Sequence, residues 1–269
     1  MSNTSLNKSK AAKNDEYYTR LEDIEKELVY YRPYLKGLKV YCNCDSEDSM
    51  FWTYLTTYYE SLGLKSLTAT HYDRNGTYRL DFINGQTVKT AVSGDGSYNS
   101  PTSKAILKEA DIVITNPPFS LFRDFIETIK DKDFIVIGCI NAVTYGNVFP
   151  MFKAGQIRLG HTTLRYYVTP DGTVKELGST SWFTTLPVNR QELELTATYN
   201  QSDYPTYSNY PAINVNKVKD IPSDYKGLMG VPVNFLTRHC ISQFRIVDRL
   251  NNPKLGEKTI YKRVIIERI

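Results

Sequence analysis

The sequence lacks the features that mark membrane, disulfide-bonded and metal-binding proteins. No run approaches the roughly 20 apolar residues that a membrane-spanning helix needs, and the polar first residues contain no apolar signal core. We therefore expect a cytoplasmic protein with no membrane association. The four cysteines are too few and too scattered for a disulfide framework, and the three histidines do not lie beside them at metal-ligand spacing. Cys42 and Cys44 are interpreted as small buried residues of one strand, and no metal site is expected.

The sequence also has little net charge, but its charged residues are unevenly distributed along the chain. The net charge of +4 is too small to require a nucleic-acid partner. Residues 1–149 contain 17 Lys and Arg against 19 Asp and Glu, whereas residues 150–269 contain 16 against 10. This excess is expected if the second part faces a polyanion, although a chance excess of solvated lysines would give the same count. With 41% hydrophobic and 23% charged residues, the 269-residue chain has the composition of a globular protein with a sizeable core.

Hydrophobic periodicity predicts an α/β fold. Residues 1–13 are rich in Ser, Asn and Lys and are predicted to be a disordered tail. Strand and helix patterns then alternate as far as residue 143, which predicts a doubly wound, mainly parallel sheet. We assign 14–155 to a catalytic domain, and 156–269 to the remaining sheet strands and a β- and loop-rich recognition region. The predicted elements are helices over 21–35, 49–63, 103–110 and 120–130, strands over 38–45, 64–73, 110–116 and 133–142, and a hairpin over 74–92.

The tetrapeptide Asn116-Pro117-Pro118-Phe119 carries the strongest chemical signal. It directly follows the apolar strand ADIVIT, and ligands bind outside the carboxyl ends of the strands in a doubly wound sheet. Two prolines fix the backbone and leave nearby carbonyls free to accept hydrogen bonds. Asn116 adds a side-chain carbonyl, and Phe119 adds a flat surface on which a planar base could stack. Two neutral acceptors beside such a ring suit an exocyclic amino group, although a plain strand-to-helix turn would use the same residues.

An Asn-Pro-Pro-aromatic turn is the signature of the adenine-specific DNA methyltransferases, which the sequence resembles. Most of the chain from Asn14 onward is similar to their EcoRI-type family, through the segments NDEYYTRLEDIEKEL, VYCNCDSEDSMFWTYL, GDG, EADIVITNPPFSLFRDFI and GLMGVPVNFL. The resemblance implies a Rossmann-like methyltransferase sheet and a catalytic domain that binds S-adenosylmethionine. It also implies methyl transfer to the amino nitrogen of a flipped-out adenine in double-stranded DNA. The setting would be restriction-modification, with a cognate restriction endonuclease acting on the same site, or a solitary or mobile-element enzyme.

The resemblance assigns residues near the first strand to the cofactor. Tyr18 and Thr19 match the motif that closes over the methionine end of the cofactor, although Arg20 stands where proline is usual. The loop after the first strand is Cys42-Asn43-Cys44-Asp45 in place of the usual glycine-rich turn. The EcoRI-type family is similar in having an acidic, glycine-poor loop here, which makes Asp45 the expected first-loop contact to the cofactor.

Two further carboxylates are cofactor candidates. Asp73 ends the second strand, where acidic residues accept hydrogen bonds from ribose hydroxyls, and a solvated turn aspartate is the alternative. Asp95, in Gly94-Asp95-Gly96, matches the family loop that meets the cofactor adenine, and a β-turn is the alternative. Ser46 and Ser49 are better explained as helix caps.

The residues present also predict how transfer and DNA binding would work. Asn116 Oδ1 and the Pro117 carbonyl would accept hydrogen bonds from the two N–H groups of the adenine amino group. Direct transfer of the methyl group then needs neither a base nor a metal. Lys217, Lys219 and Arg238, in the basic second part, are candidates for phosphate contacts.

Other functions stay open. The same turn occurs in enzymes that methylate RNA adenines or protein glutamine amides, because each of these substrates presents a planar NH2 group. The basic second part and the EcoRI-type segments favour DNA over both. The missing glycines also leave room for a catalytically silent DNA-binding protein that has lost cofactor affinity.

Overall fold

The computed structural model describes residues 18–73, 77–169 and 172–269. The predicted disordered tail, 1–13, lies outside these residues. Within them, no helix is long and apolar enough to cross a membrane.

The chain forms two compact units. Unit 1 takes the chain as far as Cys139 together with Gly160–Leu186, and unit 2 comprises Ile140–Leu159 and Pro187–Ile269. The boundary that we placed at residue 155 falls within the first segment of unit 2. The assignment of 14–155 and 156–269 to two functional domains stays a prediction.

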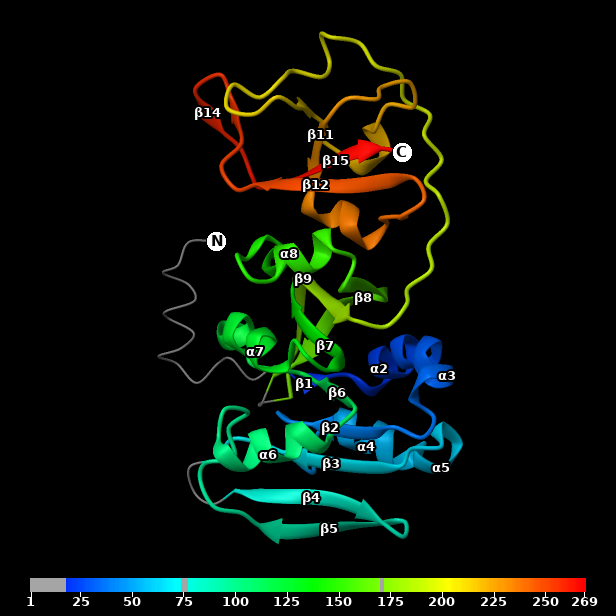
Figure 1. The fold of residues 1–269 in the computed structure, drawn as a ribbon, viewed down its shortest axis with the longest axis vertical. Helices are drawn as coiled ribbons and strands as arrows, with labels where there is room; N and C mark the ends of the chain where they lie inside the picture. Colours follow the sequence, from blue (N-terminus) through cyan, green and yellow to red (C-terminus); the bar gives the residue numbers. More distant parts are fainter. Residues whose placement is uncertain (1–17, 74–76, 170–171) are drawn as a thin grey trace. The chain divides into compact units, whose positions relative to one another are not determined.

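Unit 1 is built on a mixed sheet, which has nine strands within the described residues (Figure 1). The central strands run parallel in the order β7-β6-β2-β3, and antiparallel strands extend the sheet on both sides. The parallel arrangement is therefore confined to the centre. Across the sheet the strands are β1 (Tyr18–Thr19), β8 (Arg158–Val168), β9 (Val174–Thr184), β7 (Asp133–Cys139), β6 (Ile112–Thr115), β2 (Lys39–Cys42), β3 (Ser66–Thr70), β4 (Tyr78–Ile83) and β5 (Gln86–Ala91).

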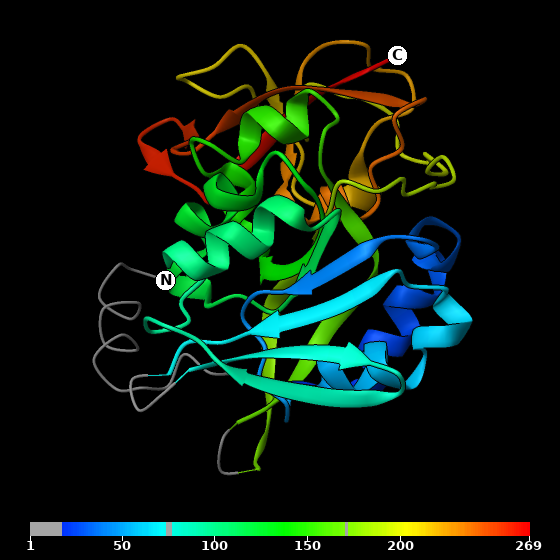
Figure 2. The ribbon, with the colours of Figure 1, turned by 60° about the horizontal axis from the view of Figure 1, so that its bottom comes forward.

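Helices cover both faces of the central strands (Figure 2). The helices α2 and α4 pack on each other on one face, and α6 and α7 lie on the other. A buried strand between two helical layers is apolar on both sides, and all four residues of β6 are indeed buried. The helices of unit 1 are α2 (Leu21–Leu28), α3 (Arg32–Leu35), α4 (Met50–Thr57), α5 (Tyr59–Leu62), α6 (Pro101–Glu109) and α7 (Phe122–Ile129), with the 3-10 turns η1 (Val29–Tyr31) and η2 (Phe119–Leu121).

Local sequence explains where these elements begin and turn. Ser49 caps α4 as predicted, because its Oγ accepts a hydrogen bond from the Phe51 amide at 3.1 Å. Strands β4 and β5 are joined at Asn84-Gly85, where both residues have positive φ (50° and 78°), as the favoured two-residue hairpin turn requires. The hairpin predicted over 74–92 is therefore the outer edge of the main sheet. Its other predicted turn, Asn75-Gly76, lies outside the described residues.

Unit 2 consists of short strands and long connections. Its main sheet has the order β10-β11-β15-β12, in which only β10 and β11 pair in parallel. Ile265, within this sheet, forms a small apolar cluster with the buried residues Tyr207 and Ala212. The elements are α8 (Phe149–Lys153), β10 (Ile213–Asn214), β11 (Met229–Pro232), β12 (Phe244–Leu250), β13 (Lys254–Leu255), β14 (Lys258–Thr259) and β15 (Arg263–Arg268), with the 3-10 turns η3 (Ile140–Thr144), η4 (Val218–Asp220) and η5 (Val233–Thr237).

Candidate active site

Loops of unit 1 come together at the carboxyl ends of the parallel strands. The Asp45 amide, after β2, donates to the Thr70 carbonyl at the end of β3 (3.1 Å), and the Asp73 amide donates to the Asp95 carbonyl (3.1 Å). The Thr115 hydroxyl, at the end of β6, donates to the Asp45 carboxylate. These loops therefore share the edge of the sheet at which ligands bind in open α/β sheets.

The Asn116-Pro117-Pro118-Phe119 turn leaves β6 at this edge. Pro117 is buried, and the other three residues are half-buried. The Pro118 carbonyl accepts a hydrogen bond from the Leu121 amide at 3.0 Å. This bond closes the 3-10 turn η2, which directly precedes α7. Within the described residues, no backbone amide from outside the turn's own helical segment donates to the Pro117 carbonyl. That carbonyl can therefore accept a hydrogen bond from a bound group.

Two phenylalanines beside this turn have different surroundings. Phe122 is 1% exposed and packs against Phe183, and a Cβ added to Gly138 would lie 2.4 Å from its ring. The half-buried Phe119 instead meets Tyr167 edge-to-face, with ring centroids 6.3 Å apart. Phe122 is therefore a core residue, whereas Phe119 keeps part of its ring accessible.

The Asp45 carboxylate is buried and hydrogen-bonded within the protein. The residue is only 4% exposed. Ser49 Oγ donates to Oδ1 at 2.5 Å, Thr115 Oγ1 donates to Oδ2, and the Asn116 backbone amide is a third donor. Burial raises the pKa of the Asp45 carboxyl to about 6, against the opposing effect of these hydrogen bonds. The sequence had predicted a direct cofactor contact here.

Asn43, in the same loop, has an unusual environment that sequence reasoning missed. The residue is 1% exposed, and neither Oδ1 nor Nδ2 of its side chain has a hydrogen-bond partner among the described residues. A buried amide without partners is costly, so such groups usually meet a ligand or ordered water. The available signal was its position where a cofactor-binding turn is expected.

Asp73 and Asp95 lie side by side, as their backbone hydrogen bond requires. The Asp73 carboxylate is 40% exposed, with His71 Nε2 4.0 Å from it. The exposed Asp95 carboxylate accepts a hydrogen bond from the Ser97 amide at 3.0 Å, and this bond holds the Asp95 pKa below its ordinary value. A Cβ at Gly96 would lie 2.1 Å from the His71 carbonyl, so glycine allows this turn to approach the end of β3.

Tyr18 and Thr19 form β1, which pairs antiparallel with β8. Thr19 is buried opposite Tyr167, the residue whose ring contacts Phe119, whereas Tyr18 is 43% exposed. This pairing brings the first described residues close to the Asn-Pro-Pro-Phe turn. Arg20, in place of the usual proline, binds Asp23 at 2.9 Å and so holds the first turn of α2.

Lys217, Lys219 and Arg238 belong to unit 2. All three residues are exposed: Lys217 directly precedes η4, Lys219 lies within it, and Arg238 directly follows η5. Unit 2 contains 14 Lys and Arg against 8 Asp and Glu, whereas unit 1 has 19 against 21. The basic excess of the second half therefore resides in unit 2.

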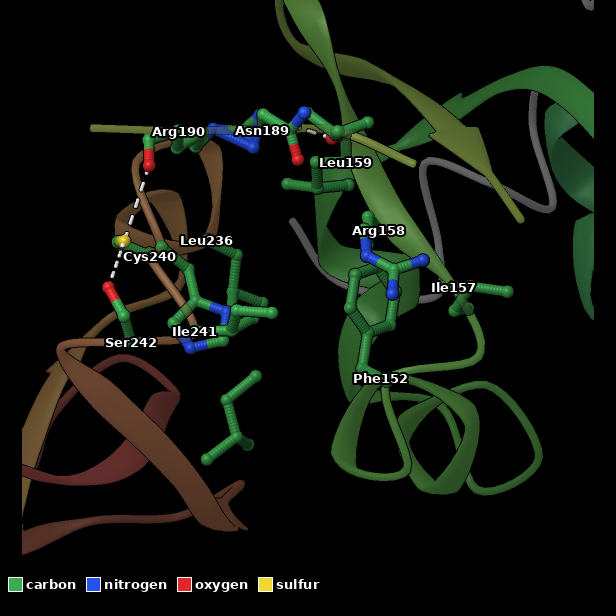
Figure 3. Close-up of a pocket in the computed structure, with 14 residues that line it drawn as sticks. Phe152, Ile157, Arg158, Leu159, Asn189, Arg190, Leu236, Cys240, Ile241 and Ser242 are labelled. Carbon is green, nitrogen blue, oxygen red and sulfur yellow. Dashed lines mark hydrogen bonds between the residues drawn. The ribbon is translucent and has the colours of Figure 1, made fainter. Parts of the chain in front are cut away.

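Unit 2 also contains a pocket of about 170 Å³ that the sequence did not predict (Figure 3). Arg190 shapes one wall, because its guanidinium donates to the carbonyls of Thr237 (2.6 Å) and Leu159 (3.1 Å). Cys240 Sγ in turn donates to the Arg190 carbonyl at 3.3 Å. Within the described ranges, no cluster of His, Cys, Asp and Glu side chains could hold a metal ion.

Acidic loops and an Asn-Pro-Pro-Phe turn at the carboxyl edge of an α/β sheet define the class of a methyltransferase. The family model described as adenine-specific methyltransferase EcoRI matches residues 5–93 and 84–267. Type II methyltransferase M.EcoRI from Escherichia coli is 38% identical, over 91% of this chain and 89% of the relative. Type II methyltransferase M.MpnI from Mycoplasma pneumoniae is also 38% identical, over 92% and 86%. The chain belongs to this EcoRI-type adenine-specific methyltransferase family. Comparison with solved structures found no match.

Proposed function

We propose that the chain is a site-specific DNA methyltransferase that transfers the methyl group of S-adenosylmethionine to the N6 amino group of an adenine flipped out of duplex DNA. The observation that carries this proposal is the turn Asn116–Phe119, which offers hydrogen-bond acceptors and a half-buried aromatic residue at the carboxyl edge of the sheet. Membership of the family supports adenine as the substrate base. In this proposal the central strands of unit 1 form a doubly wound, Rossmann-like methyltransferase sheet.

The residues at the sheet edge fit S-adenosylmethionine. The buried Asn43 amide needs a polar partner, which a bound cofactor would provide. Asp73 has an exposed carboxylate that suits ribose hydroxyls, and Asp95 lies directly beside it. Tyr18 and Thr19 are candidates for the methionine end. When bound, S-adenosylmethionine supplies an electrophilic methyl group on its sulfonium.

The Asn-Pro-Pro-Phe turn would prepare the adenine amino group for attack. This nitrogen is a poor nucleophile, because its lone pair is delocalised into the ring. Asn116 Oδ1 and the Pro117 carbonyl accept hydrogen bonds from its two N–H groups and favour a more tetrahedral nitrogen. Phe119 stacks on the extruded base, and its contact helps to offset the few kcal/mol that extrusion costs. In the proposed reaction this nitrogen would take the methyl group, the carbon–sulfur bond would break to leave a neutral thioether, and the surplus amino proton would pass to water.

Unit 2 is the proposed DNA-recognition region. Its excess of positive charge suits the phosphate backbone, and Lys217, Lys219 and Arg238 are exposed there. The relatives are named type II methyltransferases, so a cognate restriction endonuclease acting on the same site stays a prediction for this chain. We also propose a cytoplasmic location, because the relatives are named type II methyltransferases.

Methyl-transfer assays can separate these assignments from the alternatives. The purified protein would receive S-adenosylmethionine with a labelled methyl group and, in parallel, duplex DNA, RNA or a glutamine-containing protein. We expect label in DNA only, as N6-methyladenine. Label in RNA or protein would replace the proposed substrate. Calorimetric absence of cofactor binding would instead favour a silent DNA-binding protein.

A further inference from the structure

The turn that would hold the target amine is anchored by a residue of a different loop. Asp45 lies after β2, and its carboxylate accepts hydrogen bonds from the last residue of β6, Thr115, and from the backbone amide of Asn116. Thr115 lies 70 residues after Asp45 along the chain, and Asn116 directly follows Thr115. The carboxylate therefore ties the start of the Asn-Pro-Pro-Phe turn to the first strand's loop.

Asp45 is itself firmly placed. Its amide donates to the Thr70 carbonyl at 3.1 Å, which fixes its backbone to the end of β3. Ser49 Oγ donates to Oδ1 at 2.5 Å and at the same time caps α4. Asp45 is also only 4% exposed. Its carboxylate is therefore a rigid acceptor for the two donors of the turn.

These contacts constrain the backbone of Asn116 from both sides. The hydrogen bond to Asp45 fixes the orientation of its amide, and Pro117 restricts the conformation of the residue before it. The backbone that carries the Asn116 side chain is therefore held in place. A productive hydrogen bond to the amine requires Asn116 to be placed within a fraction of an ångström, and displacement of about 1 Å can cost roughly 100-fold in rate.

We propose that Asp45 is a positioning residue, which holds Thr115 and the Asn116 backbone so that Asn116 can engage the target amine. This inference rests on the proposed function, and it gives Asp45 a role other than direct contact with the cofactor. Its oxygens already accept from three protein donors, and its burial leaves little surface for a ligand.

Thr115→Val is the sharpest test, because it removes the hydroxyl donor and keeps the shape of the side chain. We expect single-turnover methyl transfer, at saturating S-adenosylmethionine and DNA, to fall on the order of 10-fold, with the cofactor Kd changed by less than about 2-fold. Thr115→Ser should restore most of the rate, because it returns the hydroxyl. Asp45→Asn should have the larger effect, on the order of 100-fold.

Thr184→Val is the matched control. Thr184 is also fully buried in the same sheet, and its hydroxyl also makes a hydrogen bond, with the Leu186 amide at 3.0 Å. Thr184 pairs with Ile135 of β7 and Thr115 with its neighbour Val136, so β7 separates the two threonines, and the recorded partner of Thr184 is Leu186 rather than Asp45. We expect it to lower the melting temperature to a similar extent as Thr115→Val, with the rate per folded molecule unchanged.

The outcomes separate the positioning role from the proposed function. If the wild type transfers no methyl group to DNA adenine, the proposed function fails. If the wild type is active and Thr115→Val and Asp45→Asn keep the wild-type rate per folded molecule, the positioning role is wrong. The positioning role is also wrong if Asp45→Asn raises the cofactor Kd but keeps the wild-type rate at saturating cofactor. Asp45 would then bind the cofactor directly.

Discussion

The two units differ in how they use their charged and polar side chains. In unit 1, acidic residues slightly outnumber basic ones, and key groups of the site, such as Asp45 and Asn43, are almost completely buried. In unit 2, basic residues exceed acidic ones by six, and Lys217, Lys219 and Arg238 point to solvent. Buried polar groups act through fixed geometry, whereas exposed charges act through a screened field. Chemistry is therefore expected to depend on unit 1, and general affinity for a polyanion on unit 2.

Asn116→Ala tests the first half of this comparison with the largest expected effect. Loss of one preorganised group typically costs ~10²–10³ in rate, so methyl transfer should fall by this factor. The cofactor Kd should stay nearly unchanged, because in the proposed mechanism the Asn116 side-chain carbonyl binds the target amine and not the cofactor. Single-turnover kinetics and calorimetry on the same preparation measure both. Wild-type turnover would remove Asn116 from the mechanism.

Phe119 and Phe122 form a pair that tests whether burial separates structural from functional rings. Phe122→Ala should destabilise the protein by about 3–5 kcal/mol, because that ring lies in the core. Phe119→Ala should cost much less stability but weaken capture of the flipped base by about 1–3 kcal/mol, and Phe119→Tyr should keep much of the activity. Chemical denaturation gives the stabilities, and the fluorescence of 2-aminopurine at the target position reports extrusion. Equal stability losses for the two alanine variants would show that Phe119 is also structural.

Part of this arrangement could be predicted from sequence because the signals are local. The buried run Ile112–Thr115, the cap at Ser49 and the tetrapeptide Asn116–Phe119 each lie within a few residues. They placed the turn at the end of a buried strand, as the structure shows. Local periodicity also predicted the helices that lie between the central strands.

Other features depend on long-range pairing that no short segment contains. The alternating residues of β8 and β9 are typical of many strands, and nothing in them specifies that β9 pairs with β7 and β8 with β1. The hydrogen bonds of Asp45 to Thr115 and Asn116 form only when β2 and β6 become neighbours. An aspartate in a cofactor loop could equally face a ligand or the protein, and the sequence contained no information to decide.

Asp73→Ala addresses cofactor binding within unit 1. If the exposed carboxylate forms charge-assisted hydrogen bonds to the ribose, its loss should weaken S-adenosylmethionine binding by about 1–3 kcal/mol. Transfer at saturating cofactor should change far less. Titration calorimetry of the variant decides, and an unchanged Kd would leave Asp73 as a solvated turn residue.

Alanine substitutions in unit 2 should have the smallest individual effects. Replacing Lys217, Lys219 or Arg238 should weaken binding to all DNA sequences alike and flatten the salt dependence by roughly one unit per lost phosphate contact. Fluorescence anisotropy at several salt concentrations gives this slope. A slope that none of the three substitutions alters would place the DNA on other residues, and a change in sequence preference would indicate base contacts.

Sequencing of DNA from cells that express the protein tests the central claim most directly, with a method that detects N6-methyladenine. Expression of the Asn116→Ala variant serves as the control. The account predicts N6-methyladenine at one short recurring sequence with the wild type, and nearly none with the variant. Genomic DNA without N6-methyladenine above background, from cells that contain folded wild-type protein able to bind S-adenosylmethionine, would contradict it.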